Sequence, residues 1–382
     1  MIRGRSLRYI FVAGLTLAAC LGALRFTAES HVAADTLPAQ ISDEAFWRMI
    51  SEFSEPGGHF RSDNFLSNEN SFQYVIPRLT KSVSPGDVYL GVGPEQNFTY
   101  LVALQPKLAF IIDIRRQNML EHLLYKALIE LSANRAEFVS RLFSRESSSD
   151  LGANPSVTAL FEAYRSAQPS RELFQENLEA VRDQLIARHG FGLTSDDLTG
   201  IEYVYNAFYN GGPELNYSFT GGGQGGWNWF PTYAQLMTET DGRGEHRSYL
   251  ATEENFRILR GLERNNVIVP LVGDFAGPKA LRSVGRYLKE HDATATAFYT
   301  SNVEQYLFQQ DEDWKKFYSN VATIPVDESS TFIRSVSNRG FQYRTSNQGR
   351  RSMPRLCEIA DLLKAFDRGR IVTYSDVIAM SN

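Results

Sequence analysis

The sequence predicts an α/β protein built on a doubly wound, mostly parallel sheet. A short β-rich run at residues 88–90 ends in the glycine turn 91–94, and a helix-like stretch starts near Gln96. A continuous apolar run at 108–112 then ends in Asp113, which is typical of a strand buried on both faces of a parallel sheet. Repeated βα units joined by right-handed crossovers form a doubly wound sheet.

Further periodic segments extend this pattern along the chain. Strands are predicted at 267–272, 294–299 and 322–326. Helices are predicted at 43–53, 72–79, 157–166, 171–189, 195–209, 252–264, 279–289 and 355–366. Because residues 117–262 are mainly helical in pattern, we expect them to form a helical insertion between the second and third strands.

The N-terminus differs in composition from the rest of the chain. Arg3, Arg5 and Arg8 precede an apolar run at 9–24, and no acidic residue occurs before Glu29. This order is typical of a secretory signal or a short membrane anchor. Arginines before the apolar run favour an N-terminus inside the cell, which directs the body of the protein outward.

Three fates of this segment are consistent with its residues. Residues 17–20 resemble the bacterial lipobox, in which Cys20 becomes lipidated, and 32–34 offer small residues for ordinary cleavage. An uncleaved anchor is the third alternative, although the run is short for a span of about 20 residues. We therefore expect residues 1–34 to direct the export of a bacterial protein or to anchor it in the membrane. Residues 35–382 are expected to form the α/β domain.

Composition limits the classes of partner. The chain has a net charge of −5 and no long run of basic residues. It therefore lacks the positive electrostatic field that attracts nucleic acid. Cys20 and Cys357 are the only cysteines, and the six histidines show no metal-ligand spacing. We expect a small-molecule ligand, no nucleic acid and no metal, and the sequence does not define the oligomeric state.

The first predicted strand and helix enclose a turn suited to a nucleotide-type ligand. Gly91 and Gly93 let the backbone approach a cofactor and expose amide donors at the start of a helix. Asp113, at the end of the next strand, is placed to accept two ribose hydroxyls. Two other interpretations stay open, since Asp113 can cap the following helix and Asn97 can either bind a ligand or complete the turn.

These residues resemble motifs of the class I S-adenosylmethionine-dependent methyltransferases. Residues 88–94 are similar to the first motif, whose glycines lie beside the methionine part of the cofactor, and Asp113 matches the ribose-binding acid. Asp274 and Phe275 are similar to the acid that meets the adenine amine and to its apolar neighbour. Residues 300–307 resemble the fourth motif, which faces the methyl acceptor.

The resemblance covers roughly residues 65 to 330 and implies a Rossmann-like methyltransferase fold, S-adenosylmethionine as cofactor and an unidentified acceptor. The chain from Phe53 onward also resembles an uncharacterised group of bacterial proteins with this fold. Candidate catalytic residues are Glu69, Ser301 and Asn302. Candidate cofactor-binding residues are Gly91, Gly93, Asn97, Asp113, Asp274 and Phe275.

Departures from the family pattern leave alternatives open. Tyr89 stands where the family has an acid, and Glu95 stands where a third small residue is common. Asp274 can instead cap the helix that starts near Pro278, and Ser301 with Asn302 can form a helix N-cap.

Two functions from different classes follow. The first is methyl transfer from S-adenosylmethionine, with the loop at 221–229, which holds Trp227 and Trp229, as a lid. The second is an exported, non-catalytic ligand-binding or structural protein that keeps the fold, because S-adenosylmethionine is a cytosolic cofactor. A nicotinamide-dependent oxidoreductase is disfavoured by the absence of a third glycine.

Overall fold

The computed structural model of the chain describes residues 37–83, 87–146, 151–152, 154–217, 230–337 and 352–382. Residues Leu37–Asn382 form one compact unit. The predicted export or anchor segment with Cys20, and the predicted lid at 221–229, lie outside the described residues. Within the described residues, no helix has the length and apolar character needed to cross a membrane.

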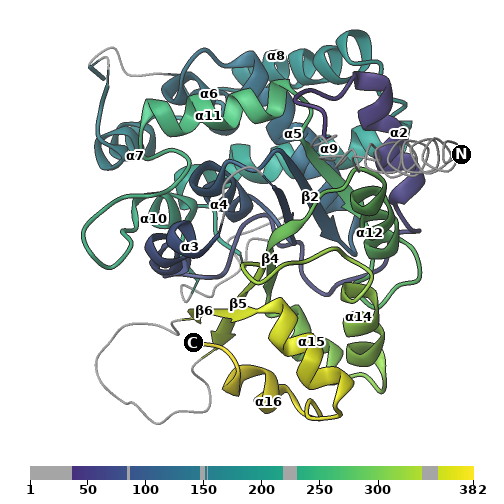
Figure 1. The fold of residues 1–382 in the computed structure, drawn as a ribbon. Coiled ribbons are helices and arrows are strands. Elements are labelled where there is room, and N and C mark those ends of the chain that lie inside the picture. Colours follow the sequence, from purple (N-terminus) through teal and green to yellow (C-terminus); the bar gives the residue numbers. More distant parts are fainter. Residues whose placement is uncertain (1–36, 84–86, 147–150, 153, 218–229, 338–351) are drawn as a thin grey trace, which may run out of the picture. The chain divides into compact units, whose positions relative to one another are not determined.

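Six strands of the described chain form one sheet in the order β3-β2-β1-β4-β5-β6 (Figure 1). Strands β1 to β5 run parallel, and β6 pairs antiparallel with β5. Their bounds are β1 (Val88–Gly91), β2 (Leu108–Asp113), β3 (Ile268–Val272), β4 (Ala295–Ser301), β5 (Thr331–Ser337) and β6 (Ser352–Glu358). The predicted α/β fold with a mostly parallel sheet is therefore confirmed.

The central strands align their carboxyl ends along one edge of the sheet. Residues of β1, β2 and β3 are buried throughout, as expected of parallel strands covered on both faces. Gly91 pairs with Ile111, and Asp113 pairs with Val272. Because β4 extends to Ser301, the strand ends that carry the predicted site residues meet at this edge.

Helices cover both faces of the sheet, with α4 and α12 on opposite sides (Figure 1). The first helices are α2 (Asp43–Phe53), α3 (Ile76–Ser82), α4 (Gln96–Leu104), α5 (Arg116–Leu131), α6 (Arg135–Phe143), α7 (Val157–Ser166), α8 (Arg171–Arg182) and α9 (Ser195–Gly211). The later ones are α10 (Tyr233–Thr238), α11 (Glu253–Arg264), α12 (Ala280–Glu290), α13 (Val303–Leu307), α14 (Asp313–Val321), α15 (Ile359–Asp367) and α16 (Tyr374–Ala379). Two 3₁₀ turns, Phe72–Val75 and Gly212–Glu214, and a π-helical segment, Asp183–Arg188, complete the set of described elements.

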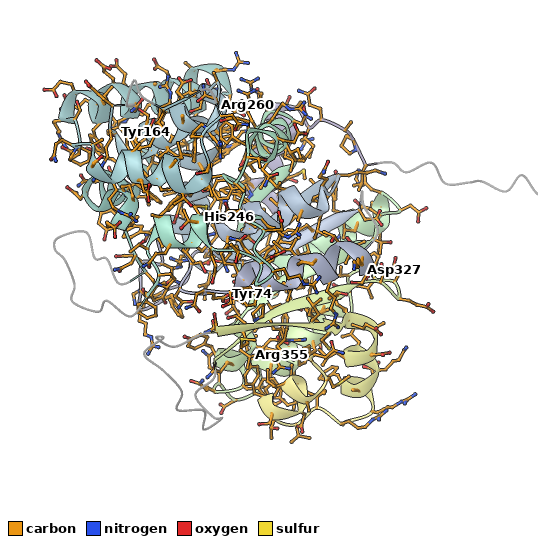
Figure 2. The ribbon with its side chains drawn as sticks, turned by 90° about the vertical axis from the view of Figure 1, so that its left-hand side faces the viewer. Tyr74, Tyr164, His246, Arg260, Asp327 and Arg355 are labelled. Atoms are coloured by element: carbon orange, nitrogen blue, oxygen red, sulfur yellow. The ribbon has the colours of Figure 1, made fainter. Side chains whose placement is uncertain are left out.

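Helices α5 to α11 form the insertion that follows β2, as predicted. Tyr164 of α7 lies in this helical block, whereas Arg355 of β6 lies at the other end of the unit (Figure 2). Capping explains why several of these helices start where they do: Thr194 and Asp197 form a reciprocal capping box at the start of α9.

Two predictions near the C-terminus were wrong. Residues 322–326 are not a strand, because the Ala322 and Ile324 amides still donate to the carbonyls of Tyr318 and Val321 at 2.9 Å at the end of α14. The helix predicted at 355–366 starts only at Ile359. Residues before it form the edge strand β6, where Pro354 is tolerated because an edge strand does not use every amide in pairing.

Candidate functional site

A cavity of about 250 Å³ lies at the carboxyl ends of β1 to β4. The strand order reverses between β1 and β4, so this is the topological switch point of the sheet. Open α/β sheets place their ligand sites in the crevice at such a point. The position of the cavity is thus the one that the fold provides for a ligand.

The cavity brings together most of the predicted site residues. The predicted residues that line it are Glu69, Gly93, Asp113, Asp274, Phe275, Ser301 and Asn302. Gly91 and Asn97 are not among the residues that line the cavity. The polar segment before the first strand also lies along the cavity, through Asn64, Ser67 and Asn68.

The two glycines of the turn have different surroundings. Gly93 has a φ of +78°, and a Cβ added to it would meet no atom within 4 Å. Gly91 is enclosed, because a Cβ there would overlap the side-chain oxygen of Asn97 and approach Tyr89 Cε1 to 2.8 Å. The Gly93 side of the turn is therefore open, and the Gly91 side is filled by the protein itself.

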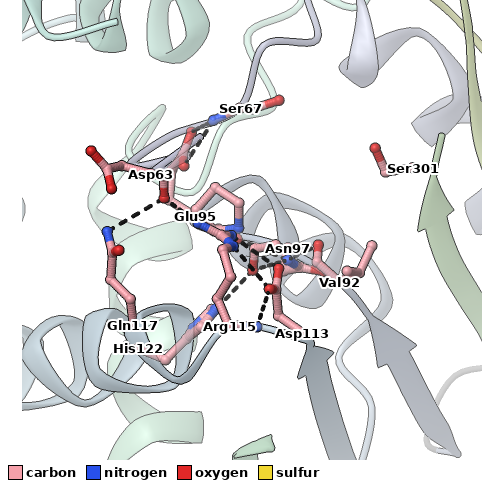
Figure 3. Close-up of polar contacts among 12 residues, drawn as sticks. Asp63, Ser67, Val92, Glu95, Asn97, Asp113, Arg115, Gln117, His122 and Ser301 are labelled. Atoms are coloured by element: carbon pink, nitrogen blue, oxygen red, sulfur yellow. Dashed lines mark hydrogen bonds and ion pairs between the residues drawn. The ribbon is translucent and has the colours of Figure 1, made fainter. Parts of the chain in front are cut away.

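Asn97 holds the glycine turn in shape. Its Nδ2 donates to the carbonyls of Val92, Gly93 and Pro94 at 3.0, 3.1 and 2.8 Å (Figure 3). Its Oδ1 accepts from the Tyr89 hydroxyl at 2.8 Å. The side chain is fully buried. These contacts support the interpretation that Asn97 completes the turn.

Asp113 forms a buried ion pair with Arg115 (Figure 3). Arg115 Nε donates to Oδ1 and Nη2 to Oδ2, both at 3.0 Å, and the Arg115 amide donates to Oδ1 at 2.9 Å. Arg115 also donates to the carbonyl of Asp63. Since both residues line the cavity, the acid predicted to bind ribose is already engaged by a cation.

Two further ionisable side chains lie beneath the turn. Glu95 is fully buried, and its carboxyl oxygens accept the Ser67 amide at 3.3 Å. Burial raises the pKa of Glu95 to about 8. Burial lowers the pKa of His122 to about 4, so its neutral ring donates from Nε2 to the Gly93 carbonyl at 2.9 Å.

On the opposite side of the cavity, Glu69 and Ser301 are in direct contact. The Ser301 hydroxyl donates to Glu69 Oε1, and the Tyr299 hydroxyl donates to Oε2 at 2.8 Å. Burial raises the pKa of Glu69, and these hydrogen bonds act in the opposite direction. Ser301 has a φ of +52°, a conformation that is uncommon for a residue other than glycine and that recurs at functional sites.

Asn302 is the N-cap residue of α13, but its side chain makes no capping hydrogen bond. The Ser301 hydroxyl lies 3.4 Å from Asn302 Oδ1. The prediction of a Ser301–Asn302 helix cap therefore holds for the position of Asn302 and not for a side-chain hydrogen bond.

Asp274 and Phe275 follow the end of β3. Asp274 Oδ1 accepts the Ala276 amide at 2.9 Å, and burial raises the pKa of this carboxyl. The cap of α12 comes instead from Glu55, whose Oε1 accepts the Lys279 and Ala280 amides at 2.7 Å. The alternative in which Asp274 caps this helix is thus wrong.

Phe275 closes one wall of the cavity. Its ring stacks on Phe317 with 5.4 Å between centroids and 13° between planes, and it meets Phe298 edge-on. It is 3% exposed.

Sequence reasoning missed the roles of Tyr299 and His122, because neither follows a recognised spacing. Arg116 is half exposed and pairs with Asp197, whereas Arg115 is buried on Asp113. Among the residues described, no group of three or more His, Cys, Asp or Glu side chains is placed to hold a metal ion.

The sheet and its cavity define an α/β protein with a cavity at the topological switch point. A family model described as "Domain of unknown function (DUF7790)" matches residues 64–354. The match spans more than half of the chain, and the chain belongs to this family. No curated protein matches the chain.

Proposed function

We propose that the cavity binds S-adenosylmethionine and that the protein is a methyltransferase with a Rossmann-like fold, acting on a small acceptor. One observation carries this proposal: the four segments that resemble methyltransferase motifs line one cavity at four neighbouring strand ends. If these residues served only to cap helices, they would not need to line one shared cavity.

The residues that would hold the cofactor have distinct roles. The open side of Gly93 leaves room for the methionine part, and Asp113 would accept the ribose hydroxyls. Phe275 offers an apolar surface to the adenine ring, and the Asp274 carboxyl lies beside it to accept from the adenine amine. S-adenosylmethionine supplies a methyl group on a reactive sulfonium, so that holding the acceptor in line provides much of the acceleration.

Asp113 fits this role only in part. A carboxylate has about four acceptor positions, and Arg115 already donates to Asp113 from its amide, Nε and Nη2. About one position is left, whereas a ribose diol donates two hydrogen bonds. Binding of a ribose therefore requires Arg115 to withdraw at least one of its donors.

Glu69 is the side chain best suited to take a proton from the acceptor. Its buried carboxyl has a raised pKa, which brings it closer to neutral pH, where a general base is most effective. Ser301 donates to one of its oxygens and orients it toward the cavity. The acceptor hydroxyl or amine would replace Ser301 as the donor to Glu69.

A second function is favoured by a specific observation. The Asp113–Arg115 pair occupies most of the acceptor positions that a ribose would use. This pair suits an exported, non-catalytic ligand-binding or structural protein that keeps the fold. Such a protein would bind a ligand without the diol contact to Asp113, or no nucleoside at all.

Calorimetric titration of the full chain with S-adenosylhomocysteine separates the two functions. We expect micromolar binding by the wild-type protein and its loss in Asp113→Ala, with circular dichroism to verify folding. Asp361→Ala is the matched control, because Asp361 is exposed on α15 and pairs with Lys364. Absence of binding by the folded wild-type protein would rule out the methyltransferase and favour the second function.

A further inference from the structure

Glu121 is a buried acid without a counter-charge in contact. It lies on α5 and is 0% exposed, and neither of its carboxyl oxygens makes a hydrogen bond with any other described part of the chain. Leaving a buried polar group without a hydrogen bond destabilises the fold, and the effect is larger when the group is charged. Such a group is kept either by a role or by compensation elsewhere.

The charges that face Glu121 come from several elements. Glu95 approaches from the start of α4, Asp113 from β2, Asp63 from the segment before the first strand, and Arg115 from the start of α5 itself. Arg115 is the cation of this set, and it is bound to Asp113. Glu121 therefore stands within the field of a guanidinium that is engaged with a different carboxylate.

The same helical face carries other unsatisfied polar atoms. Asn118 and His122 lie three residues before and one residue after Glu121, which places all three on the buried side of α5. The side-chain amide of Asn118 and the Nδ1 of His122 have no hydrogen-bond partner in the described structure. This face is polar, buried and incompletely satisfied, so it can receive a hydrogen-bond donor.

Burial raises the pKa of Glu121 well above its usual range, and Glu95 raises it further, whereas Arg115 lowers it. Burial therefore favours the neutral form of Glu121 while Arg115 remains on Asp113. Arrival of a guanidinium would favour its ionised form, because an opposite charge in a buried site stabilises the carboxylate.

Resting on the proposed function, we propose that Arg115 exchanges carboxylates: it pairs with Asp113 in the ligand-free site and moves to Glu121 when a ribose diol binds Asp113. Arginine keeps its charge in proteins and must have an acceptor when it is buried. Glu121 is thus a positioning residue that acts on the ligand site through Arg115.

The exchange has a definite proton balance. Asp113 replaces the Arg115 donors with two ribose hydroxyls. Glu121 loses its carboxyl proton to solvent and accepts the guanidinium. Binding of one ligand therefore releases about one proton near neutral pH.

Calorimetry of the full chain with S-adenosylhomocysteine, in phosphate and in Tris at equal pH, measures this proton because the two buffers differ in ionisation enthalpy. We expect about one proton released per ligand by the wild-type protein and none by Glu121→Gln, whose affinity falls roughly tenfold. Glu121→Met is a second variant that removes the acceptor without burying a polar amide. Glu263→Gln is the matched control, because Glu263 is also a buried carboxyl but lies near the end of α11. It should behave as wild type.

The double variant decides whether Glu121 acts through Arg115. Arg115→Met frees Asp113 and should bind at least as tightly as wild type, without proton release. Adding Glu121→Gln to Arg115→Met should then change the affinity by less than about twofold, because the two residues act on one step.

Two outcomes would overturn the exchange. If Glu121→Gln and Glu121→Met match the wild type in affinity and proton release, the exchange is wrong and the methyltransferase proposal stands. If neither the wild-type protein nor Arg115→Met binds S-adenosylhomocysteine while folded, the proposed function and the exchange fail together.

Discussion

Arg115 and Asp113 form a bidentate ion pair at the edge of the cavity, with the Nε and Nη2 atoms each 3.0 Å from a different carboxylate oxygen. Their side chains are 6% and 8% exposed. The pair neutralises the strand-end acid on which a nucleoside site depends. Any ligand that uses Asp113 must therefore compete with an intramolecular cation.

This pair should matter for stability as well as for binding. Removing one partner of a buried ion pair leaves an uncompensated charge, so we expect Arg115→Met to lower the free energy of unfolding by about 3 kcal/mol. Arg165→Met is the matched control, because Arg165 and Glu214 are 49% and 55% exposed and their pair should contribute less than about 1 kcal/mol. Urea unfolding of the three proteins measures the difference. Equal losses would show that Asp113 does not depend on Arg115.

The hydrogen bonds that Asn97 makes with the glycine turn and with Tyr89, here called the brace, give a second prediction. Asn97→Ala removes the donors to three loop carbonyls and leaves the Tyr89 hydroxyl buried without its acceptor, so we expect a loss of about 3 kcal/mol. Tyr89→Phe should cost less in the Asn97→Ala background than in the wild type, because the hydrogen bond is already broken. Denaturant unfolding of the four proteins tests this coupling. Strictly additive losses would contradict the brace, and the exposed Asn210→Ala serves as control.

Two glycine-to-alanine substitutions distinguish a glycine that is packed against other side chains from one that faces open space. Gly91→Ala forces a Cβ against Asn97 and Tyr89, and we expect it to destabilise the protein by about 1–3 kcal/mol. Gly261→Ala, within α11, places its Cβ where no atom lies within 4 Å and should stabilise the protein by up to about 1 kcal/mol. Thermal unfolding distinguishes the two. A neutral Gly91→Ala would mean that the turn can open on this side.

His189 gives a pH-dependent prediction outside the cavity. Its Nδ1 lies 2.8 Å from Asp43 and its Nε2 2.6 Å from Glu130. Burial lowers the pKa of His189, but the hydrogen bonds and charges of Glu130 and Asp43 outweigh it and raise the pKa above 6.5. Because the folded-state pKa is above the unfolded one, the contribution to stability is full below pH 6.5 and is lost as the pH rises through the folded pKa.

We therefore expect His189→Gln to destabilise the protein more at about pH 6 than at about pH 9. Burial raises the pKa of Glu130, but His189 and Lys126 outweigh it and lower this pKa to about 2. Glu130 therefore stays ionised between about pH 6 and about pH 9, so its own contribution to stability is the same at both pH values. Urea titrations at both pH values measure the effect, and the exposed His246→Gln is the control. A loss that is independent of pH would contradict the charged state of His189.

The fold was largely predictable, and the state of the site was not. Apolar runs such as 108–112 announce buried strands, and their order along the chain places Gly93, Asp113 and Ser301 at one edge. Edge strand β6 escaped prediction because it is only half buried and contains proline. The pairing of Arg115 with Asp113, rather than with solvent, depends on the depth of burial, which residue spacing does not encode.

Helix α5 shows the same limit of prediction from sequence. The helical pattern of this region was predicted from its sequence, but Glu121 and His122 on the buried side of α5 follow no motif. His122 is buried against the Gly93 carbonyl, and α5 packs against α9 and α11, which lie far along the chain. Only tertiary packing could identify Glu121 and His122 as neighbours of the cavity.

A crystal structure of the full chain grown with S-adenosylhomocysteine tests the central claim most directly. We expect the adenosine ribose to contact Asp113 and the amino-acid part to lie along Gly93, with the adenine ring beside Phe275. A nucleoside bound elsewhere, or Asp113 still paired with Arg115 and no ligand in the cavity at saturating concentration, would contradict the proposed function.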